Sequence, residues 1–222
     1  MIYAKKLSEF KEITHGFTTR EEKDYQIWLT QNSAVAKNCV RANQVHGNDI
    51  KQVKNGDKNK IIKKTDGLIT KNKNIFLGIK TADCLPILFY EPEAKIVAAV
   101  HAGWRGTSQE IAGKMVDKIL EMGGIGENII CVIGPHICEK CYDVLEDRAK
   151  LFDKSVVNKL GGKFYLDLGL INIKQLLEQG ILEKNIELMP YCTFHQNEMF
   201  FSYRKNKDKN YGEMLAFIGM IN

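Results

Sequence analysis

Two apolar runs of strand length, separated by four residues, constrain the fold of this chain more than any other feature. They are PILFY at 86–90 and KIVAAV at 95–100, and the EPEA segment between them suits a four-residue hairpin loop. A hairpin joins antiparallel strands, whereas parallel strands need a long crossover. The pattern therefore argues against a purely parallel, doubly wound sheet.

Strand-like and helix-like patterns alternate along the rest of the chain. Apolar, partly β-branched runs predict strands at 75–80 and 128–134, and a closing strand pair at 200–204 and 213–221. A helix is predicted at 107–124 from its apolar stripe and from a Thr107-x-x-Glu110 capping box, with further helices at 143–160 and at 172–179, the last closed by Gly180. We expect a single domain, 1–222, with a mixed-sheet α/β sandwich fold, β-hairpins and flanking helices.

Composition excludes several classes of protein. The hydrophobic fraction is 44% and the charged fraction is 27%, which is ordinary for a globular domain. The net charge of +5 comes from lysines in 54–64 and 204–210, where acidic and Asn residues are interspersed, so we expect solvated loops and no nucleic-acid partner. No apolar run approaches the ~20 residues of a membrane span, and the start lacks a secretory signal. We expect a cytoplasmic protein with no membrane partner, as a monomer or a small homo-oligomer.

The hairpin also places two chemically active side chains. If Tyr90 faces Lys95, then Cys84 faces His101 on the same side of the sheet, with Cβ atoms roughly 4.5–5.5 Å apart. A change of one in the register would put the two side chains on opposite faces. A thiolate and an imidazole at that distance can share a metal ion, or can act as the nucleophile and base of a Cys–His hydrolase.

Further candidates for this site come from neighbouring motifs. His46 in NQVHGND is the third possible metal ligand, because Gly47 permits a sharp turn beside it. Asp83 is a candidate catalytic carboxylate next to Cys84. Since neighbouring side chains in a strand point to opposite faces, Asp83 alternatively orients a ligand or braces a loop.

Six cysteines occur, at 39, 84, 131, 138, 141 and 192. Cys138 and Cys141 form a Cys-x-x-Cys pair, beside His136. A structural zinc ribbon needs a second such pair, and none is present, so we interpret these two as ordinary thiols in a loop.

The chain resembles a known family in seven ordered motifs. They are QVHG (44–47), TDGLIT (65–70), TADCLPI (81–87), VHAGWRGT (100–107), IGP (133–135), CYDV (141–144) and FSYR (201–204), preceded by GFTTR (16–20). This set is similar to the laccase-domain family, formerly labelled polyphenol oxidase and now understood as zinc-dependent purine nucleoside phosphorylases that also deaminate adenosine. The resemblance implies one zinc ion held by His46, Cys84 and His101, and purine nucleosides and phosphate as substrates.

Substrate contacts follow from the same motifs. Arg105 is one of few arginines in a lysine-rich chain, and its planar fork suits phosphate, so it is a candidate catalytic and substrate-binding residue. The backbone N–H of Gly106 and the ring of Trp104 are further candidates. Arg41 and Gln44, shortly before His46, complete the predicted substrate-binding set.

The sequence departs from the family at one phosphate contact that the resemblance implies, and it disfavours copper chemistry. Tyr211-Gly212-Glu213 stands where the family often has Thr-Gly-Arg, so an arginine contact with phosphate is missing there. A copper polyphenol oxidase is disfavoured, because multicopper sites use many histidines in His-x-His pairs. This chain has five histidines and no such pair.

Overall fold

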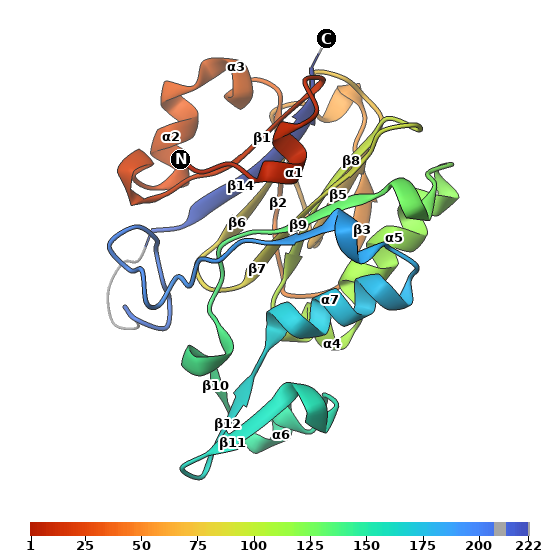
Figure 1. Cartoon of the computed structure of the whole chain (residues 1–222). Helices are drawn as coiled ribbons and strands as arrows, with labels where there is room; N and C mark the ends of the chain where they lie inside the picture. Colours follow the sequence, from red (N-terminus) through yellow and green to blue (C-terminus); the bar gives the residue numbers. More distant parts are fainter. Residues whose placement is uncertain (207–211, 222) are drawn as a thin grey trace.

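The computed structural model describes residues 1–206 and 212–221, and it shows two larger sheets stacked face to face with helices outside them (Figure 1). The five-stranded sheet has the order β1 (Ile13–Phe17), β14 (Met214–Met220), β6 (Phe76–Thr81), β2 (Cys39–Ala42) and β4 (Ile61–Ile62). The six-stranded sheet has the order β13 (Ile186–Leu188), β9 (Ile130–Ile133), β7 (Leu85–Glu91), β8 (Ile96–Ala102), β5 (Gly67–Thr70) and β3 (Ile50–Gln52).

Both sheets mix parallel and antiparallel pairs. In the first, β14 runs antiparallel to β1 and β6, while β2 runs parallel to β6 and β4. In the second, β7 and β8 form the antiparallel hairpin. The edge strand β13 runs parallel to its neighbour β9, and the edge strand β3 runs parallel to its neighbour β5. The predicted mixed α/β sandwich is therefore confirmed.

Apolar side chains hold the layers together. Leu77 and Ile79 of β6 meet Leu88 and Ala99 of the hairpin in a fully buried core between the two sheets. The opposite face of the hairpin packs against α5 (Ile111–Glu121) and α7 (Leu168–Glu178). The outer face of the five-stranded sheet lies under α2 (Tyr25–Gln31) and α3 (Ser33–Ala36), and α1 (Lys5–Ser8) packs near β1. Among the described residues, no helix combines the length and apolarity needed to cross a membrane.

In the observed hairpin, each residue of β7 faces a residue two positions further along the chain than predicted. Glu91 faces Ile96, so the loop is 92–95, and Lys95 closes it with a left-handed φ of 55°. His101 consequently faces Pro86 rather than Cys84. Because the shift is even, Cys84 and His101 still project to the same side, and Cys84 lies just before β7 begins.

The predicted helix at 107–124 is two helices. The shorter one is α4 (Trp104–Ser108), and Glu110, with a left-handed φ of 59°, separates it from α5. The expected capping box is wrong, because Thr107 lies inside α4 and its Oγ1 accepts a hydrogen bond from Asn172 Nδ2 at 3.1 Å. The third predicted helix is α7, which begins earlier than expected, and Gly180 follows it with φ 82°.

The prediction of one helix over 143–160 is wrong. A three-stranded antiparallel sheet, β10 (Asp143–Val144), β12 (Lys163–Leu166) and β11 (Val157–Leu160), projects there with α6 (Glu146–Ala149), at the bottom of Figure 1. Gly161 and Gly162 have positive φ values of 56° and 78°, as a tight two-residue hairpin turn requires. This turn folds β11 onto β12, and a continuous helix is thereby excluded.

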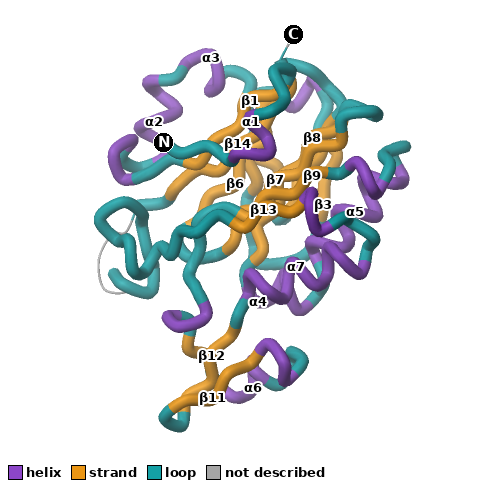
Figure 2. The backbone as a smooth tube through the Cα atoms, in the orientation of Figure 1, coloured by secondary structure: helices purple, strands orange, loops and turns teal. Residues whose placement is uncertain are grey.

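The expected closing strand pair is half right. Residues 214–220 form β14, but its partners are β1 and β6. The 200–204 segment is not a strand; Phe200 and Phe201 instead pack against Met214 in a separate cluster. Figure 2 shows that the chain between β13 and the grey segment runs as loops and turns.

Candidate metal centre

Three predicted ligands converge at the end of the six-stranded sheet where β7 begins and β8 ends. His46 lies in the loop after β2, Cys84 directly precedes β7, and His101 lies near the end of β8. One donor atom from each lies within 4.8 Å of the other two. The two imidazole rings meet edge to face, with centroids 4.8 Å apart. His46 is exposed and His101 is buried, so the cluster has one side open to solvent.

Asp66 organises this cluster, and the sequence analysis did not single it out. Its Oδ1 lies 2.8 Å from His101 Nδ1 and accepts the N–H of His46 at 3.0 Å. Its Oδ2 accepts the N–H groups of Val45 and Gly47 at 3.1 and 2.9 Å. One buried carboxylate thus fixes the His46 loop and the His101 ring together. The only signal in the sequence was its place in the TDGLIT motif.

The ligands polarise one another. Burial raises the pKa of the Cys84 thiol, but the positive charge of His101 and hydrogen bonds from His101 and His46 outweigh it and lower the pKa to about 6. Burial lowers the pKa of His101, but the Cys84 thiolate and Asp66 raise it to about 9. Because the thiolate is the metal-binding form of cysteine, Cys84 is prepared to bind a cation.

The space between the ligands fits a metal ion. A Cβ placed on Gly103 would lie 3.2 Å from Cys84 Sγ and 3.4 Å from His46 Cδ2, so glycine keeps this space free of side-chain atoms. A Cβ on Gly106 would lie 2.8 Å from the carbonyl oxygen of Gly47, so glycine also allows α4 to approach the His46 loop. Two imidazoles and one thiolate suit zinc and leave a fourth position open.

Two guanidinium groups lie over the ring of Trp104, the residue that follows Gly103. The Arg105 guanidinium lies 4.6 Å from the Trp104 ring centroid, and that of Arg148, from α6, lies 4.8 Å from the same ring. Arg105 is exposed and Trp104 is half-buried. The structure therefore places Arg148 on the same ring as Arg105, and this contact was missed because α6 was expected to be part of a longer helix.

Asp83 braces loops, which is the alternative that strand geometry favoured over a catalytic role. Its Oδ1 accepts a hydrogen bond from Thr193 Oγ1 at 2.6 Å, and its Oδ2 accepts the N–H of Arg204 at 2.6 Å. Its carbonyl oxygen accepts the N–H of Ile137 at 2.9 Å. Both carboxylate oxygens are therefore engaged by the protein.

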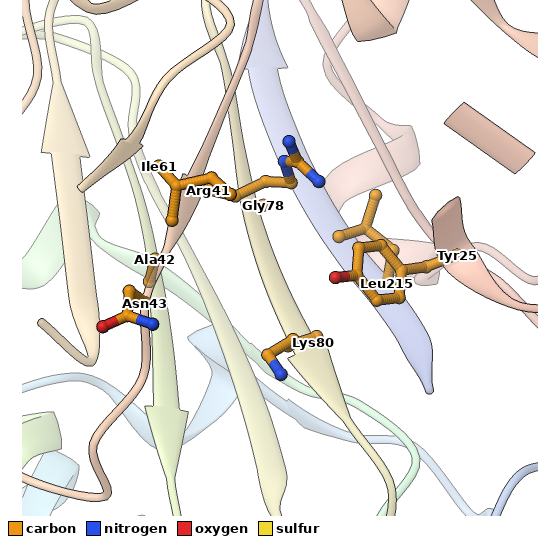
Figure 3. Close-up of a pocket in the computed structure, with 8 residues that line it drawn as sticks. All are labelled: Tyr25, Arg41, Ala42, Asn43, Ile61, Gly78, Lys80 and Leu215. Carbon is orange, nitrogen blue, oxygen red and sulfur yellow. The ribbon is translucent and has the colours of Figure 1, made fainter. Parts of the chain in front are cut away.

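Two residues predicted to contact substrate, Gln44 and Arg41, interact with other parts of the protein. The Gln44 side chain donates to the carbonyl oxygen of Lys80 at 2.8 Å and accepts its N–H at 3.0 Å, so its amide ties the His46 loop to β6. Arg41 lines a hollow of about 140 Å³, and none of the three candidate ligands is part of its wall. Figure 3 shows its lining residues: Tyr25, Arg41, Ala42, Asn43, Ile61, Gly78, Lys80 and Leu215.

Of the three residues that stand where the family often has Thr-Gly-Arg, the structure describes Gly212 and Glu213. Tyr211 lies outside the described residues. Glu213 forms an ion pair with Lys80 Nζ at 3.0 Å, and its N–H donates to Asp24 Oδ2 at 3.0 Å.

The fold and the site define an α/β sandwich protein with a Cys–His–His cluster at the ends of the central strands of one sheet. A family model described as multi-copper polyphenol oxidoreductase laccase matches residues 19–221. The chain belongs to this laccase-like family, as its motifs indicated.

Two named proteins and one solved structure are similar to this chain and agree with this assignment. Purine nucleoside phosphorylase YlmD of Bacillus subtilis (strain 168) is 34% identical, over 95% of this chain and 89% of that protein. Adenosine deaminase RL5, from an unknown prokaryotic organism, is 34% identical over 63% of this chain and 56% of that protein. The crystal structure of YlmD from Geobacillus stearothermophilus has a TM-score of 0.89 at 28% identity, over 99% of this chain and 94% of that chain.

Proposed function

We propose that this protein is a zinc-dependent purine nucleoside phosphorylase that also deaminates adenosine. The observation that carries the proposal is the convergence of His46, Cys84 and His101 around the space that Gly103 leaves free. The names of the relatives in the same family supply the substrate class. Purine nucleosides and phosphate are accordingly the proposed substrates.

Each residue of the site has a task in this proposal. Bound zinc would supply a Lewis acid that orients a substrate heteroatom and makes a nearby water more acidic. Asp66 accepts a hydrogen bond from the Nδ1–H of His101, which keeps the proton on Nδ1 and leaves Nε2 free to act as a ligand. The Arg105 and Arg148 guanidiniums beside Trp104 offer positive charge for phosphate, which must reach the anomeric carbon as the glycosidic bond breaks.

Product analysis tests the proposal directly. The zinc-loaded protein is incubated with adenosine, with and without phosphate, and the products are separated. Phosphorolysis gives adenine and ribose 1-phosphate only when phosphate is present. Deamination gives ammonia in both mixtures, with inosine as the other product where phosphate is absent. Cys84→Ala is expected to lose both activities, while Cys39→Ala, a buried thiol outside the cluster, is the matched control. Absence of all these products would reject the function.

A Cys–His hydrolase is the second candidate, favoured by the contact of the Cys84 thiol with His101 and of His101 with Asp66. This order of side chains suits a nucleophile, a base and an orienting carboxylate. The two functions respond oppositely to metal and to His46. Zinc would block a hydrolase by occupying its nucleophile, and His46→Ala would spare it, whereas the phosphorylase requires both.

A further inference from the structure

A second cluster of metal-ligating side chains lies outside the candidate metal centre. Cys138, Cys141, Cys192 and His195 each bring one donor atom to within 4.8 Å of the other three. The Nε2 of His195 lies 3.1 Å from Cys141 Sγ, and its Nδ1 lies 3.8 Å from Cys138 Sγ. Three thiols and one imidazole are the donor set of a structural zinc site.

The chain supplies these donors as two pairs of equal spacing. The second pair is Cys192-x-x-His195, in which an imidazole replaces one thiol of the Cys-x-x-Cys pattern. Short-spaced ligand pairs on two separate segments are typical of zinc-binding modules. Each pair lies in a turn, because Cys141 N–H donates to the Cys138 carbonyl at 3.0 Å and Gln196 N–H donates to the Cys192 carbonyl at 2.9 Å.

Backbone contacts hold the two turns against each other independently of any ion. His136 and Cys192 form an isolated parallel bridge, and Thr193 N–H donates to the His136 carbonyl at 3.0 Å. Cys138 N–H points at Cys192 Sγ, 3.4 Å away. An N–H group in that place puts partial positive charge against a metal-bound sulfur. The four donors are thus brought together by the fold of the loops.

We propose that these four residues, the Cys3His clasp, hold a second, structural zinc ion. Four protein donors complete a tetrahedral shell, whereas the three donors of the candidate metal centre leave one position open. The clasp therefore fastens the segment that begins at Cys192 to the loop that contains Cys138 and Cys141.

The clasp is connected to the candidate metal centre through Asp83. Thr193, inside the clasp, donates to Asp83 Oδ1 at 2.6 Å, and Ile137, next to Cys138, donates its N–H to the Asp83 carbonyl at 2.9 Å. Asp83 is the neighbour of Cys84. Zinc in the clasp would accordingly hold in place the loops that position the sulfur ligand of the other site.

Metal counting on single variants tests the clasp. Wild-type protein, freed of loosely bound metal by gel filtration, is measured by elemental mass spectrometry, and we expect two zinc ions per chain. Cys141→Ser should retain only the zinc of the candidate metal centre, and Cys84→Ala should retain only the zinc of the clasp. Cys39→Ala should retain both. A wild-type content of one zinc that Cys84→Ala removes, or iron in place of zinc, would overturn the proposal.

A second measurement decides the matter even if Cys141→Ser does not fold. The Cys84→Ala variant lacks the thiolate of the first site, so strong sulfur-to-cobalt charge-transfer absorption after cobalt exchange must come from the clasp. Absence of that absorption, or a disulfide between Cys138 and Cys141 in protein prepared without reductant, contradicts a metal clasp. Neither outcome bears on the phosphorylase proposal, which Cys84→Ala tests through its own activity loss.

Discussion

Replacing Asp66 by asparagine should weaken zinc binding at the His46–Cys84–His101 centre without removing any ligand. An asparagine oxygen in the Oδ2 position still accepts from Val45 and Gly47. Its amide nitrogen then faces His101 Nδ1, which must become an acceptor, so the proton moves to Nε2, the nitrogen needed for the metal. Loss of such a supporting partner typically costs about 10–100-fold in metal affinity.

The same substitution should destabilise the fold. The His46 N–H and the His101 N–H lose an ionised acceptor, and hydrogen bonds to charged groups contribute about 1.5–3 kcal/mol each, so we expect about 3 kcal/mol less free energy of unfolding. Zinc affinity is measured by competition with a chromophoric chelator, following the binding step that Cys84→Ala abolishes. Asp49→Asn is the matched control, because Asp49 is exposed. Unchanged zinc affinity in folded Asp66→Asn would refute the role given to Asp66.

Three further predictions concern phosphate, the sulfur ligand and pH. Arg105→Ala should raise the KM for phosphate roughly tenfold, from the loss of about 1.5 kcal/mol at an exposed site, and should leave the deamination rate nearly unchanged; an unaltered KM would place the anion elsewhere. Cys84→Ala should abolish phosphorolysis and deamination together while the circular dichroism spectrum stays native, and full turnover without zinc would make the metal a bystander. Burial lowers the pKa of His15 in the folded protein, so the unfolded chain binds a proton on this imidazole more readily. The free energy of unfolding should therefore fall as pH drops below about 6.5. Urea titrations at pH 7.5 and pH 5 should show a smaller fall for His15→Gln, which can still accept the Ala4 N–H that His15 Nε2 accepts at 3.0 Å; an equal fall would contradict the assignment.

The sequence predicted the elements whose local pattern and tertiary environment agree. Residues 86–90 and 96–100 are buried on both faces between the opposite sheet and α5, so they are continuously apolar and easily read. Their register was not predictable from that pattern. It depends on Lys95 adopting a left-handed backbone, and no residue type in the loop announces this conformation.

The helix expected at 143–160 failed for a different reason. Its residues satisfy a helical period locally, but the strand pairing of 157–160 with 163–166 decides the outcome. The signal that favours pairing is Gly161-Gly162, which lies just beyond the misread segment. The hairpin pairing of β11 with β12 overrode the helical pattern, and the contact of Arg148 with Trp104 was missed with it.

The sequence indicated the candidate metal ligands more clearly than the residues that support them. His46, Cys84 and His101 stand in distinctive motifs and were named in advance. Asp66 acts through backbone N–H groups of a loop 20 residues earlier, and spacing along the chain does not encode such a contact. His195 completes a donor set only after folding brings it to Cys141, so a search for matched cysteine pairs passed over it.

Asp83 links the two candidate metal sites through its local backbone and its carboxylate. Its φ of 100° is unfavourable for a residue with a side chain, and conformations of this kind cost about 1–3 kcal/mol. The hydrogen bonds to Thr193 and to Arg204 N–H offset that cost, because both use a buried carboxylate. The strained turn places Cys84 just ahead of β7, on the same side of the hairpin as His101. The contacts that relieve the strain come from the segment fastened by the Cys3His clasp, so the geometry of the sulfur ligand depends on a part of the chain more than a hundred residues away.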